Sequence, residues 1–400
     1  MNALPHISNA DRVLAGIGAH IDEFIQLRRD LHRHPELAFQ EHRTSALVAS
    51  LLEGWGYEVH RGLAGTGVVG VLRRGEGKSL AIRADMDALS IEEQTGLDYA
   101  SNNAGVMHAC GHDGHTTILL AAARYLAEHG RFSGTLNLIF QPAEEIGAGA
   151  QRMISEGLFE QFPVDAVFGL HNWPGFEAGR FAFVDGPAMA SVDQAIITIN
   201  GKGGHGAEPH NTVDPVLVAA HVITGLQSIV ARNVDPREMA VVTVGSIHGG
   251  SASNVIPENV ELKMTVRAYR AEVRQELKQR IPALIKAQAH SFGATADVDY
   301  RLGFPSVVNH IAETALAREV AIETFGADRI DAAFQPRTAS EDFAFMLQAR
   351  PGSYLFVGNG DSASLHSPTY DFNDAIIAPS AAYWVSLAEK FLSKTGDAKL

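Results

Sequence analysis

The residues best suited to chemistry lie in one short stretch, HACGHDGHT, at positions 108–116. Thiolate and imidazole are natural ligands of borderline-soft divalent cations, so the pair Cys110 and His112 predicts a metal site. Two ligands cannot close such a site, and the others must come from elsewhere in the chain. For this stretch alone, a polar turn that caps a helix is the alternative. His108 and His115 are weaker candidates, and His115 is predicted to make local hydrogen bonds at a helix start.

Polar side chains follow several predicted strands at the point where each strand ends. The apolar segments 79–83, 135–140 and 166–170 predict strands that alternate with helices, and a further strand at 353–357 precedes a loop with a histidine. In open α/β sheets, ligands bind beyond the carboxyl ends of the strands. Together with the pair from the first stretch, the side chains gathered in this way are Asp85, Asp87, Cys110, His112, Glu144, Glu145, His171 and His366.

This inventory matches a dinuclear metal site, which takes about five or six protein ligands and leaves one carboxylate free as a base. In the doublet Glu144-Glu145 the neighbouring side chains point in different directions, so one can bind metal while the other faces water. A solvated helix start is the alternative for the doublet alone. Asp85 and Asp87 are predicted to orient the ligands from behind, with simple capping of the next turn as the alternative.

The second half of the sequence holds candidates for substrate binding. The loop GKGGHGAEPH (201–210) places His205 among glycines, which allow a close approach to a ligand, although a single loop histidine is commonly incidental. Asn254 lies ahead of a turn, and Arg267 lies on the polar face of a predicted strand. An amide and a guanidinium together suit a substrate carboxylate. For Arg267 an ordinary surface position is the alternative.

Hydrophobic periodicity predicts an α/β protein of two domains. Residues 188–306 show the order strand, helix, strand, strand, helix, strand, which is that of a ferredoxin-like unit. This unit is inserted into a catalytic metal-binding domain, 1–187 and 307–400, with a mixed central sheet flanked by helices. The predicted helices are 11–34, 41–54, 116–129, 215–232, 271–291 with a kink or break at Pro282, 310–325, a short one opening at 340–342, and 375–392. The remaining predicted strands are 67–72, 191–200, 240–247, 258–267 and 294–302.

Composition narrows the classes of function. The 400 residues carry a formal net charge of −14, which argues against nucleic-acid binding, because such binding needs a basic patch. The single cysteine excludes an intrachain disulfide and suits a reducing compartment. No secretory signal and no membrane-spanning apolar run are evident. We therefore expect a cytoplasmic protein that acts on a small molecule, without nucleic-acid or membrane partners.

Nine segments carry a resemblance to a known family, and they span nearly the whole chain: LHRHPELAFQEHRT, IRADMDAL, MHACGHDGHT, FQPAEE, GLHNWP, GKGGHGAEPH, NVIPENVEL, SEDF and LHSPTYDFND. Their order is that of the metal-dependent aminoacylase/carboxypeptidase superfamily. They look most like its amidohydrolase branch, which includes hippurate hydrolase and plant auxin–amino acid conjugate hydrolases. Peptidase members carry a His-x-Asp motif where this chain has Asp85-Met86-Asp87, and this difference agrees with the amidohydrolase branch.

The resemblance implies a zinc-peptidase-like catalytic domain with two divalent metal ions per subunit, whether zinc, manganese, cobalt or nickel, and an inserted lid domain. By this resemblance Glu144 is the general base, and we also predict a catalytic role for Asp87. His205 corresponds to a histidine that often enters the partner subunit's active site and steadies the oxyanion, which predicts a homodimer or higher homo-oligomer through the lid. The metal ligands implied by the resemblance are Cys110, His112, Glu145, His171 and His366.

The expected activity is therefore hydrolysis of the amide bond of N-acyl amino acids, hippurate-like or other acyl and aryl conjugates. The products are a carboxylic acid and a free amino acid. In this reading Asn254 and Arg267 hold the substrate carboxylate. The first alternative is a dipeptidase or carboxypeptidase that uses the same metal centre. The second is a protein that binds such conjugates without catalysis, and the full set of ligands and base speaks against it.

Overall fold

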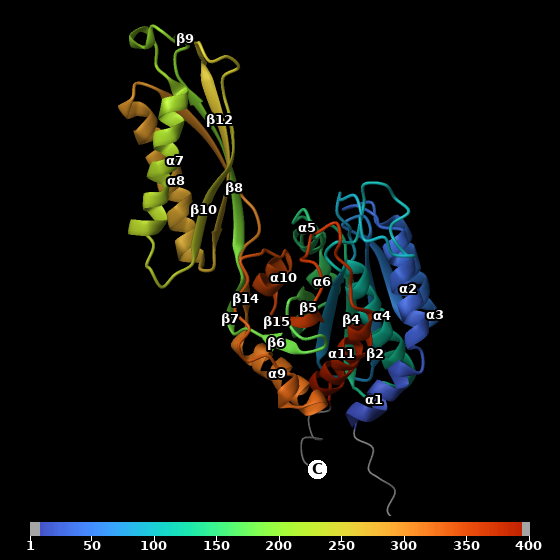
Figure 1. The fold of residues 1–400 in the computed structure, drawn as a ribbon. Coiled ribbons are helices and arrows are strands. Elements are labelled where there is room, and N and C mark those ends of the chain that lie inside the picture. The colour runs from blue at the N-terminus through green and yellow to red at the C-terminus, as the bar shows by residue number, and fades with distance from the viewer. Residues whose placement is uncertain (1–8, 394–400) are drawn as a thin grey trace, which may run out of the picture. The chain divides into compact units, whose positions relative to one another are not determined.

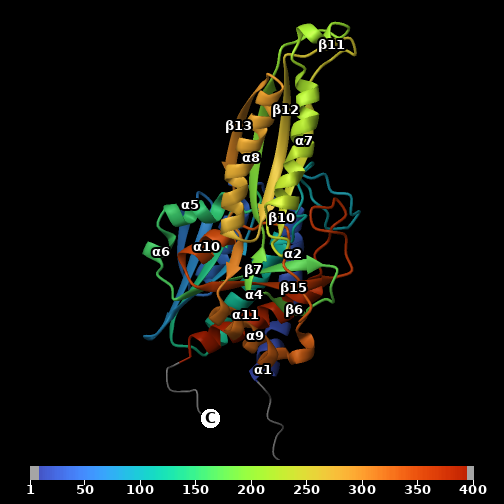
Figure 2. The same cartoon turned by 90° about the vertical axis from the view of Figure 1, so that its left-hand side faces the viewer.

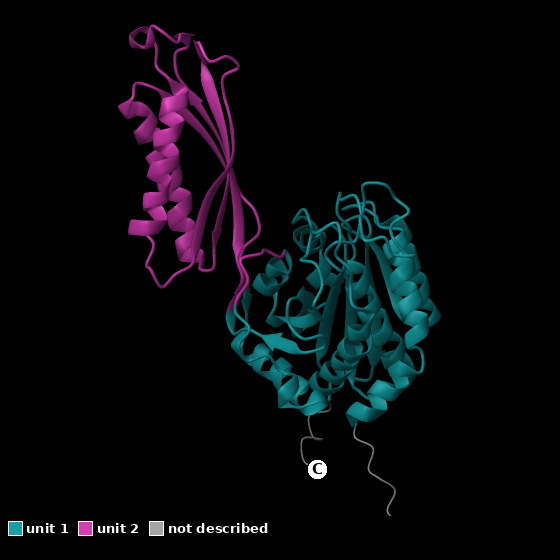
Figure 3. Cartoon of the chain, viewed as in Figure 1, with its two compact units in different colours: residues 1–186, 308–335, 342–400 teal, residues 187–307, 336–341 magenta. Residues whose placement is uncertain are grey.

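The structure, a computed structural model, describes residues 9–393, and the chain divides into two compact units. Unit 1 consists of residues 1–186, 308–335 and 342–400, and unit 2 of residues 187–307 and 336–341 (Figure 3). The predicted boundaries placed all of 307–400 in the catalytic domain, whereas 336–341 belongs to unit 2. Backbone pairing explains this difference, because Arg337 donates its N–H to Ala188 and accepts the N–H of Ala190, at 2.9 and 3.1 Å.

A seven-stranded mixed sheet forms the centre of unit 1, as predicted (Figure 1). In spatial order its strands are β1 (Glu58–Leu63), β2 (Gly67–Arg74), β4 (Gly134–Gln141), β3 (Ser79–Asp85), β5 (Ala166–Pro174), β15 (Gly352–Gly360) and β6 (Phe181–Phe183). β4, β3, β5 and β15 run parallel to one another, whereas β1, β2 and β6 pair in antiparallel fashion. The four parallel strands therefore bring their carboxyl ends to one edge of the sheet.

Helices cover both faces of this sheet. On one face lie α4 (His112–His129) and α11 (Ile377–Phe391), accompanied by α1 (Asn9–Gly18), α2 (Ile21–Arg33), α3 (His42–Gly54) and α9 (Ile311–Phe325). The other face carries α5 (Gly149–Ser155), α6 (Leu158–Gln161) and α10 (Phe343–Ala349). Alternation along the strands supplies both layers. Ile82 and Phe168 join the core under α4, whereas the Tyr354 ring packs at a tilt against Phe343 of α10 with ring centroids 5.1 Å apart.

Several predicted elements of unit 1 need correction. The helix predicted at 11–34 is two helices, because the chain turns at Ala19 and His20 while the apolar stripe continues through both. The helix predicted from residue 116 begins at His112, directly behind a left-handed glycine, Gly111. The short elements β1, β6, α5 and α6 were not predicted, since their few residues show no clear period. Of these corrections, the earlier start of α4 matters most for function, because it places the His112 side chain in the first helical turn.

Unit 2 is the predicted ferredoxin-like unit. Its sheet has the order β10 (Ala240–His248), β12 (Asn259–Ala268), β8 (Ser191–Asn200) and β13 (Thr295–Leu302), with all neighbours antiparallel. The helices α7 (Pro215–Arg232) and α8 (Ala271–Ser291) lie side by side on one face (Figure 2). Asp214 caps α7, since its carboxylate accepts the N–H of Val216 at 2.9 Å. α8 runs through Pro282 as a single helix, so of the two predicted alternatives, a kink or a break, the break is wrong.

Among the described residues, α7 is the one helix that is long and apolar enough to span a membrane by length and composition. It packs instead into the core of unit 2, where Val218, Val222, Leu226 and Ile229 are buried against the sheet and α8. At the end of unit 2 beyond the N-terminus of this helix, the short strands β9 (Gly204–His205) and β11 (Val255–Ile256) pair with each other. β7 (Gly186–Met189) pairs with β14 (Val307–Asn309).

Candidate metal centre

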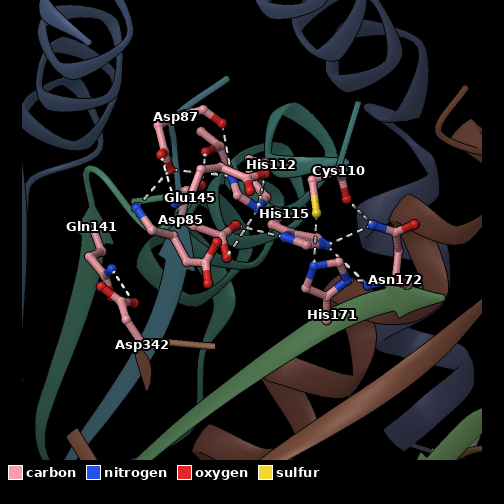
Figure 4. A network of polar contacts seen from close by, with 12 residues as sticks. Asp85, Asp87, Cys110, His112, His115, Gln141, Glu145, His171, Asn172 and Asp342 are labelled. Carbon is pink, nitrogen blue, oxygen red and sulfur yellow. Dashed lines mark hydrogen bonds and ion pairs between the residues drawn. The ribbon is translucent and has the colours of Figure 1, made fainter. Parts of the chain in front are cut away.

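The predicted ligands of unit 1 meet at the carboxyl edge of the four parallel strands. Figure 4 shows four of them, Cys110, His112, Glu145 and His171. Glu144 and Glu145 follow β4, His171 lies near the end of β5, and His366 follows β15. Cys110 and His112 arrive from the start of α4, which packs across β3, β4 and β5. The chain thus brings segments separated by more than 250 residues to one point, as the strand-end argument predicted.

Two triads of ligand atoms share one thiol. Cys110, His112 and His171 form one group, and Cys110, Glu145 and His366 form another, each with its ligand atoms within 4.8 Å of one another. Cys110 Sγ lies 3.4 Å from His171 Nε2, and Glu145 Oε2 lies 3.4 Å from His366 Nε2. Two ions at such a centre would share a ligand, and the sequence alone does not say which residue that is. Membership in both triads makes Cys110 the bridging candidate.

Backbone carbonyls orient two of the histidines. His112 donates its Nδ1–H to the carbonyl of Asp87 at 2.8 Å, and His171 donates its Nδ1–H to the carbonyl of Asn172 at 2.6 Å. These bonds fix the tautomer of each ring, so that Nδ1 carries the proton and Nε2 carries the lone pair. Hydrogen bonding of the distal nitrogen is the usual support of a metal-binding imidazole. Both rings therefore present Nε2 to the shared space around Cys110.

The buried atoms of this site fit a cation. His112 Nε2 and Glu145 Oε1 are buried, have no hydrogen-bond partner, and lie 3.8 Å apart. Burial, reinforced by the Glu145 and Glu144 carboxylates, raises the pKa of the Cys110 thiol well above its usual value. Burial raises the pKa of Glu145 to about 7. A divalent cation would hold the thiol and carboxyl in their anionic forms, since ligands bind metal deprotonated.

His115 makes hydrogen bonds at the start of α4, as predicted, but they are long-range bonds and not the local ones expected. Its Nδ1–H donates to Asp85 Oδ1 at 2.7 Å, and its Nε2 accepts the backbone N–H of Asn172 at 3.0 Å. Both ring nitrogens are therefore engaged. Asp85 also accepts from Arg83 Nη1 at 2.7 Å. With Asp85 and His115 committed to these bonds, the group Asp85, His112 and His115 is a hydrogen-bonded support rather than a third set of ligands.

Asp87 fixes the backbone of the glutamate doublet. Its Oδ1 accepts the N–H of Glu144 and its Oδ2 accepts the N–H of Glu145, both at 3.0 Å. The preceding residue, Ala143, has a φ of 55°, in the left-handed region that residues other than glycine adopt rarely. His366 has a φ of 63°, and its N–H donates to Ala109 at 2.8 Å. Unusual backbone conformations at two positions of one site are typical of functional centres.

Gly111 cannot carry a side chain. Its φ is 94°, and a Cβ there would lie 2.2 Å from Asn172 Nδ2 and 2.7 Å from the Tyr370 hydroxyl. Those two residues form a buried bridge, in which Tyr370 donates to Asn172 Oδ1 at 2.6 Å and Asn172 Nδ2 donates to the Cys110 carbonyl at 2.7 Å. The glycine between the two ligands thus allows the close approach that ties Cys110 to the end of β5.

Comparison with known proteins agrees with this geometry. The model of the family described as "Peptidase family M20/M25/M40" matches residues 81–390. The chain belongs to this family. It is 44% identical to hippurate hydrolase of Campylobacter jejuni over 92% of this chain and 97% of that protein. It is 39% identical to IAA-amino acid hydrolase ILR1-like 4 of Arabidopsis thaliana over 98% of this chain and 90% of that protein. These relatives confirm the predicted resemblance and mark the chain as an amidohydrolase.

A solved structure of family M20 resembles the whole chain. The Bacillus subtilis YXEP protein, described as a dinuclear metal binding peptidase, is 34% identical, with a TM-score of 0.81 over 94% of this chain and 99% of that one. The fold of the family is therefore confirmed for this chain. Its description also agrees with the two triads that share Cys110.

The predicted substrate-binding residues of this M20/M25/M40 member lie in unit 2. His205 in β9 pairs opposite Val255 in β11, so it lies next to Asn254. Arg267 lies near the far end of β12, where its Nη1 donates to the Thr338 carbonyl at 2.7 Å. The nine residues from Asn259 to Arg267 are eight steps along the strand, which extend over roughly 26 Å. One copy of unit 2 therefore does not bring Asn254 and Arg267 to one carboxylate.

Some supporting residues were not predicted. Tyr370 and Asn172 tie Cys110 to β5, and Asp342 accepts from Arg83, Gln141 and the Ala150 N–H beneath the site. Both Tyr370 and Asp342 fall within segments that carried the family resemblance, which was the only signal available for them. Their individual roles depend on side-chain contacts that no local pattern encodes.

The shared thiol leads to a test by metal content. Cys110→Ala removes a ligand from both triads and is expected to weaken binding of both ions, whereas His366→Ala affects one triad and should leave about one ion per chain. Each variant is equilibrated with manganese or zinc and passed through gel filtration, and atomic emission then measures the number of metal ions per chain. The midpoint of thermal unfolding with and without chelator should follow the same order, because bound metal stabilises the folded state. Two tightly held ions in Cys110→Ala would contradict a bridging thiol.

Proposed function

We propose that this chain hydrolyses the amide bond of N-acyl amino acids with aryl or other acyl groups, releasing a carboxylic acid and a free amino acid. The observation that carries the proposal is a buried glutamate beside the candidate ligands. A Glu144 carboxylate oxygen lies within 4.8 Å of a His112 ring nitrogen and a Glu145 oxygen. The names of the two relatives, which refer to hippurate and to an auxin conjugate, support an aromatic acyl group.

The site would hold two divalent ions, which would lower the pKa of water and polarise the amide carbonyl. Cys110, His112 and His171 would hold one, and Cys110, Glu145 and His366 the other. Zinc, manganese, cobalt and nickel all suit thiolate, imidazole and carboxylate ligands. A reducing compartment such as the cytoplasm suits this site, because oxidation of the thiol would remove the shared ligand.

Glu144 would act first as a base and then as an acid. Its carboxylate would take a proton from the attacking water as the new C–O bond forms. It would then give that proton to the amide nitrogen as the C–N bond breaks, so that the amine leaves neutral. Asp87 would keep the Glu144 backbone in place through its two hydrogen bonds to the doublet.

Unit 2 would bind the other parts of the substrate. Arg267 would hold the carboxylate of the amino acid, and His205 would donate a hydrogen bond to the developing oxyanion. The roughly 26 Å of strand between the two ends of unit 2 favours their delivery by two different subunits. In this proposal His205 and Asn254 of a second copy complete each active site.

The surface of α7 supports such a second copy. From Pro215 to Ala231 this helix has no charged side chain, although only part of it is buried. Val216 and Leu217 are 44% and 49% exposed. β10 lies at an edge of the same sheet and contacts α7, so a two-fold axis could pair both the helix and the strand edge with their copies. We propose a homodimer through this surface.

Removal of the proposed base gives the central test. Glu144→Gln keeps the size of the side chain but cannot take a proton, so turnover of N-benzoylglycine is expected to fall by at least about 10³-fold, within the range of acid–base contributions. Metal content, measured in parallel, should stay at the wild-type value. Near-wild-type turnover in this variant would refute the mechanism. A matched panel of N-acyl amino acids and dipeptides separates the amidohydrolase from a dipeptidase.

Mixing two inactive variants tests whether His205 acts across a dimer. In a 1:1 mixture of His205→Ala and Glu144→Ala chains, half of the dimers are mixed, and each mixed dimer has one intact site. Activity is therefore expected to return to about one quarter of the wild-type value per chain. No recovery, with exchange of subunits verified by native mass spectrometry, would mean that His205 does not act in the partner's site.

A charge on the α7 surface tests the interface itself. Leu217→Asp places an unpaired carboxylate in the proposed apolar contact and is expected to shift the protein from dimer to monomer in light scattering after gel filtration. Ile322→Asp is the matched control, because Ile322 is a 40% exposed residue of α9 in unit 1. A Leu217→Asp variant that stays dimeric would contradict the proposed surface.

A further inference from the structure

Glu41 is a buried carboxylate outside the proposed ligand set. It lies directly before α3 and is fully buried. Its Oε1 accepts the N–H of Phe39 at 3.0 Å and the N–H of Ala143 at 2.9 Å. Its Oε2 accepts the hydroxyl of Thr66 at 2.6 Å. The contact with Ala143 joins two parts of the chain that are 102 residues apart.

Ala143 determines where the glutamate doublet points. It is buried, it directly precedes Glu144, and its φ of 55° places it in the left-handed region. For a residue with a Cβ this conformation persists only where the surroundings hold it. The carbonyl of Ala143 also accepts the N–H groups of Ala148 and Gly149, at 3.2 and 3.1 Å. The loop that carries the doublet is therefore closed on Ala143.

Two carboxylates bind three consecutive amides of this loop. Glu41 accepts from Ala143, and Asp87 accepts from Glu144 and Glu145. The two acceptors come from different elements, one from the start of α3 and one from the segment after β3. A rotation of the Ala143 peptide would therefore break the bond to Glu41 and re-aim both glutamate side chains.

The Glu41 side chain is not used to cap its own helix. Glu41 occupies the N-cap position of α3 but makes no side-chain capping bond there. Glu36 provides the cap instead, because its carboxylate accepts the N–H groups of Arg43 and Thr44, both at 2.8 Å. Stabilisation of α3 and fixation of the loop thus belong to two different glutamates of the same segment.

We propose that Glu41 is a positioning residue for catalysis, which holds Ala143 in its left-handed conformation and thereby aims Glu144 and Glu145. The role of Glu144 as the base rests on the proposed function. The proposal that Glu41 fixes the loop does not depend on the role of Glu144, because it concerns only the hydrogen bond from the amide of Ala143 to Glu41. It acts through hydrogen-bond geometry, so any side chain that accepts from the two amides can replace the carboxylate.

Three variants test this proposal. Glu41→Ala removes the acceptor, and kcat for N-benzoylglycine is expected to fall at least about tenfold with KM changed less than about threefold, as for a misaligned catalytic group. Glu41→Gln keeps an oxygen that accepts from the two amides, and kcat should return to within about threefold of wild type. Glu36→Ala removes the α3 cap without touching the loop, so the unfolding midpoint should fall while kcat stays within about twofold.

Hydrogen exchange provides a readout that does not depend on activity. The amides of residues 143–145 are expected to exchange faster in Glu41→Ala than in wild type, and at the wild-type rate in Glu36→Ala. If Glu41→Ala yields no folded protein, Glu41→Leu fills the same space without an acceptor and takes its place. Unchanged exchange and kcat in folded Glu41→Ala would overturn the proposal, and so would a Glu41→Gln variant as impaired as Glu41→Ala. Failure of wild-type protein to hydrolyse N-acyl amino acids would refute the proposed function and leave the exchange test valid.

Discussion

Buried charge is the constraint on which the rest of unit 1 depends, because a carboxylate removed from water needs local partners. Asp85 is satisfied by Arg83 and His115, and Asp87 by two backbone N–H groups. Among the atoms of the described site, His112 Nε2 and Glu145 Oε1 have no hydrogen-bond partner. Residues of the same type thus divide into those that hold the scaffold and those left open to a cation.

The strand-end grouping could be predicted because it needs only two facts about the chain. Buried parallel strands are visible as apolar runs, and parallel strands place their carboxyl ends together. The start of α4 at His112 could not be predicted in this way, because it depends on the left-handed Gly111 and its contact with Asn172. The pairing of Asn254 with Arg267 was a reasonable match of chemistry, yet the length of β12 separates them in one copy.

Glu41 shows a further limit of reading a sequence locally. At the start of a helix, an acidic residue suggests a cap, and that task belongs to Glu36 five residues earlier. The contact of Glu41 with Ala143 arises only when the segment before α3 meets the segment after β4. Long-range hydrogen bonds of this kind carry information about a site that neither periodicity nor motif spacing contains.

The order of the ligands along the chain also has a consequence for biosynthesis. Three segments of the site, at residues 110–112, 144–145 and 171, precede the whole first segment of unit 2, whereas His366 follows it. A chain that grows from its N-terminus therefore presents all three residues of the first candidate triad before unit 2, and His366 of the second only after the first segment of unit 2. A metal ion bound at the second candidate triad would therefore report that synthesis has passed residue 366.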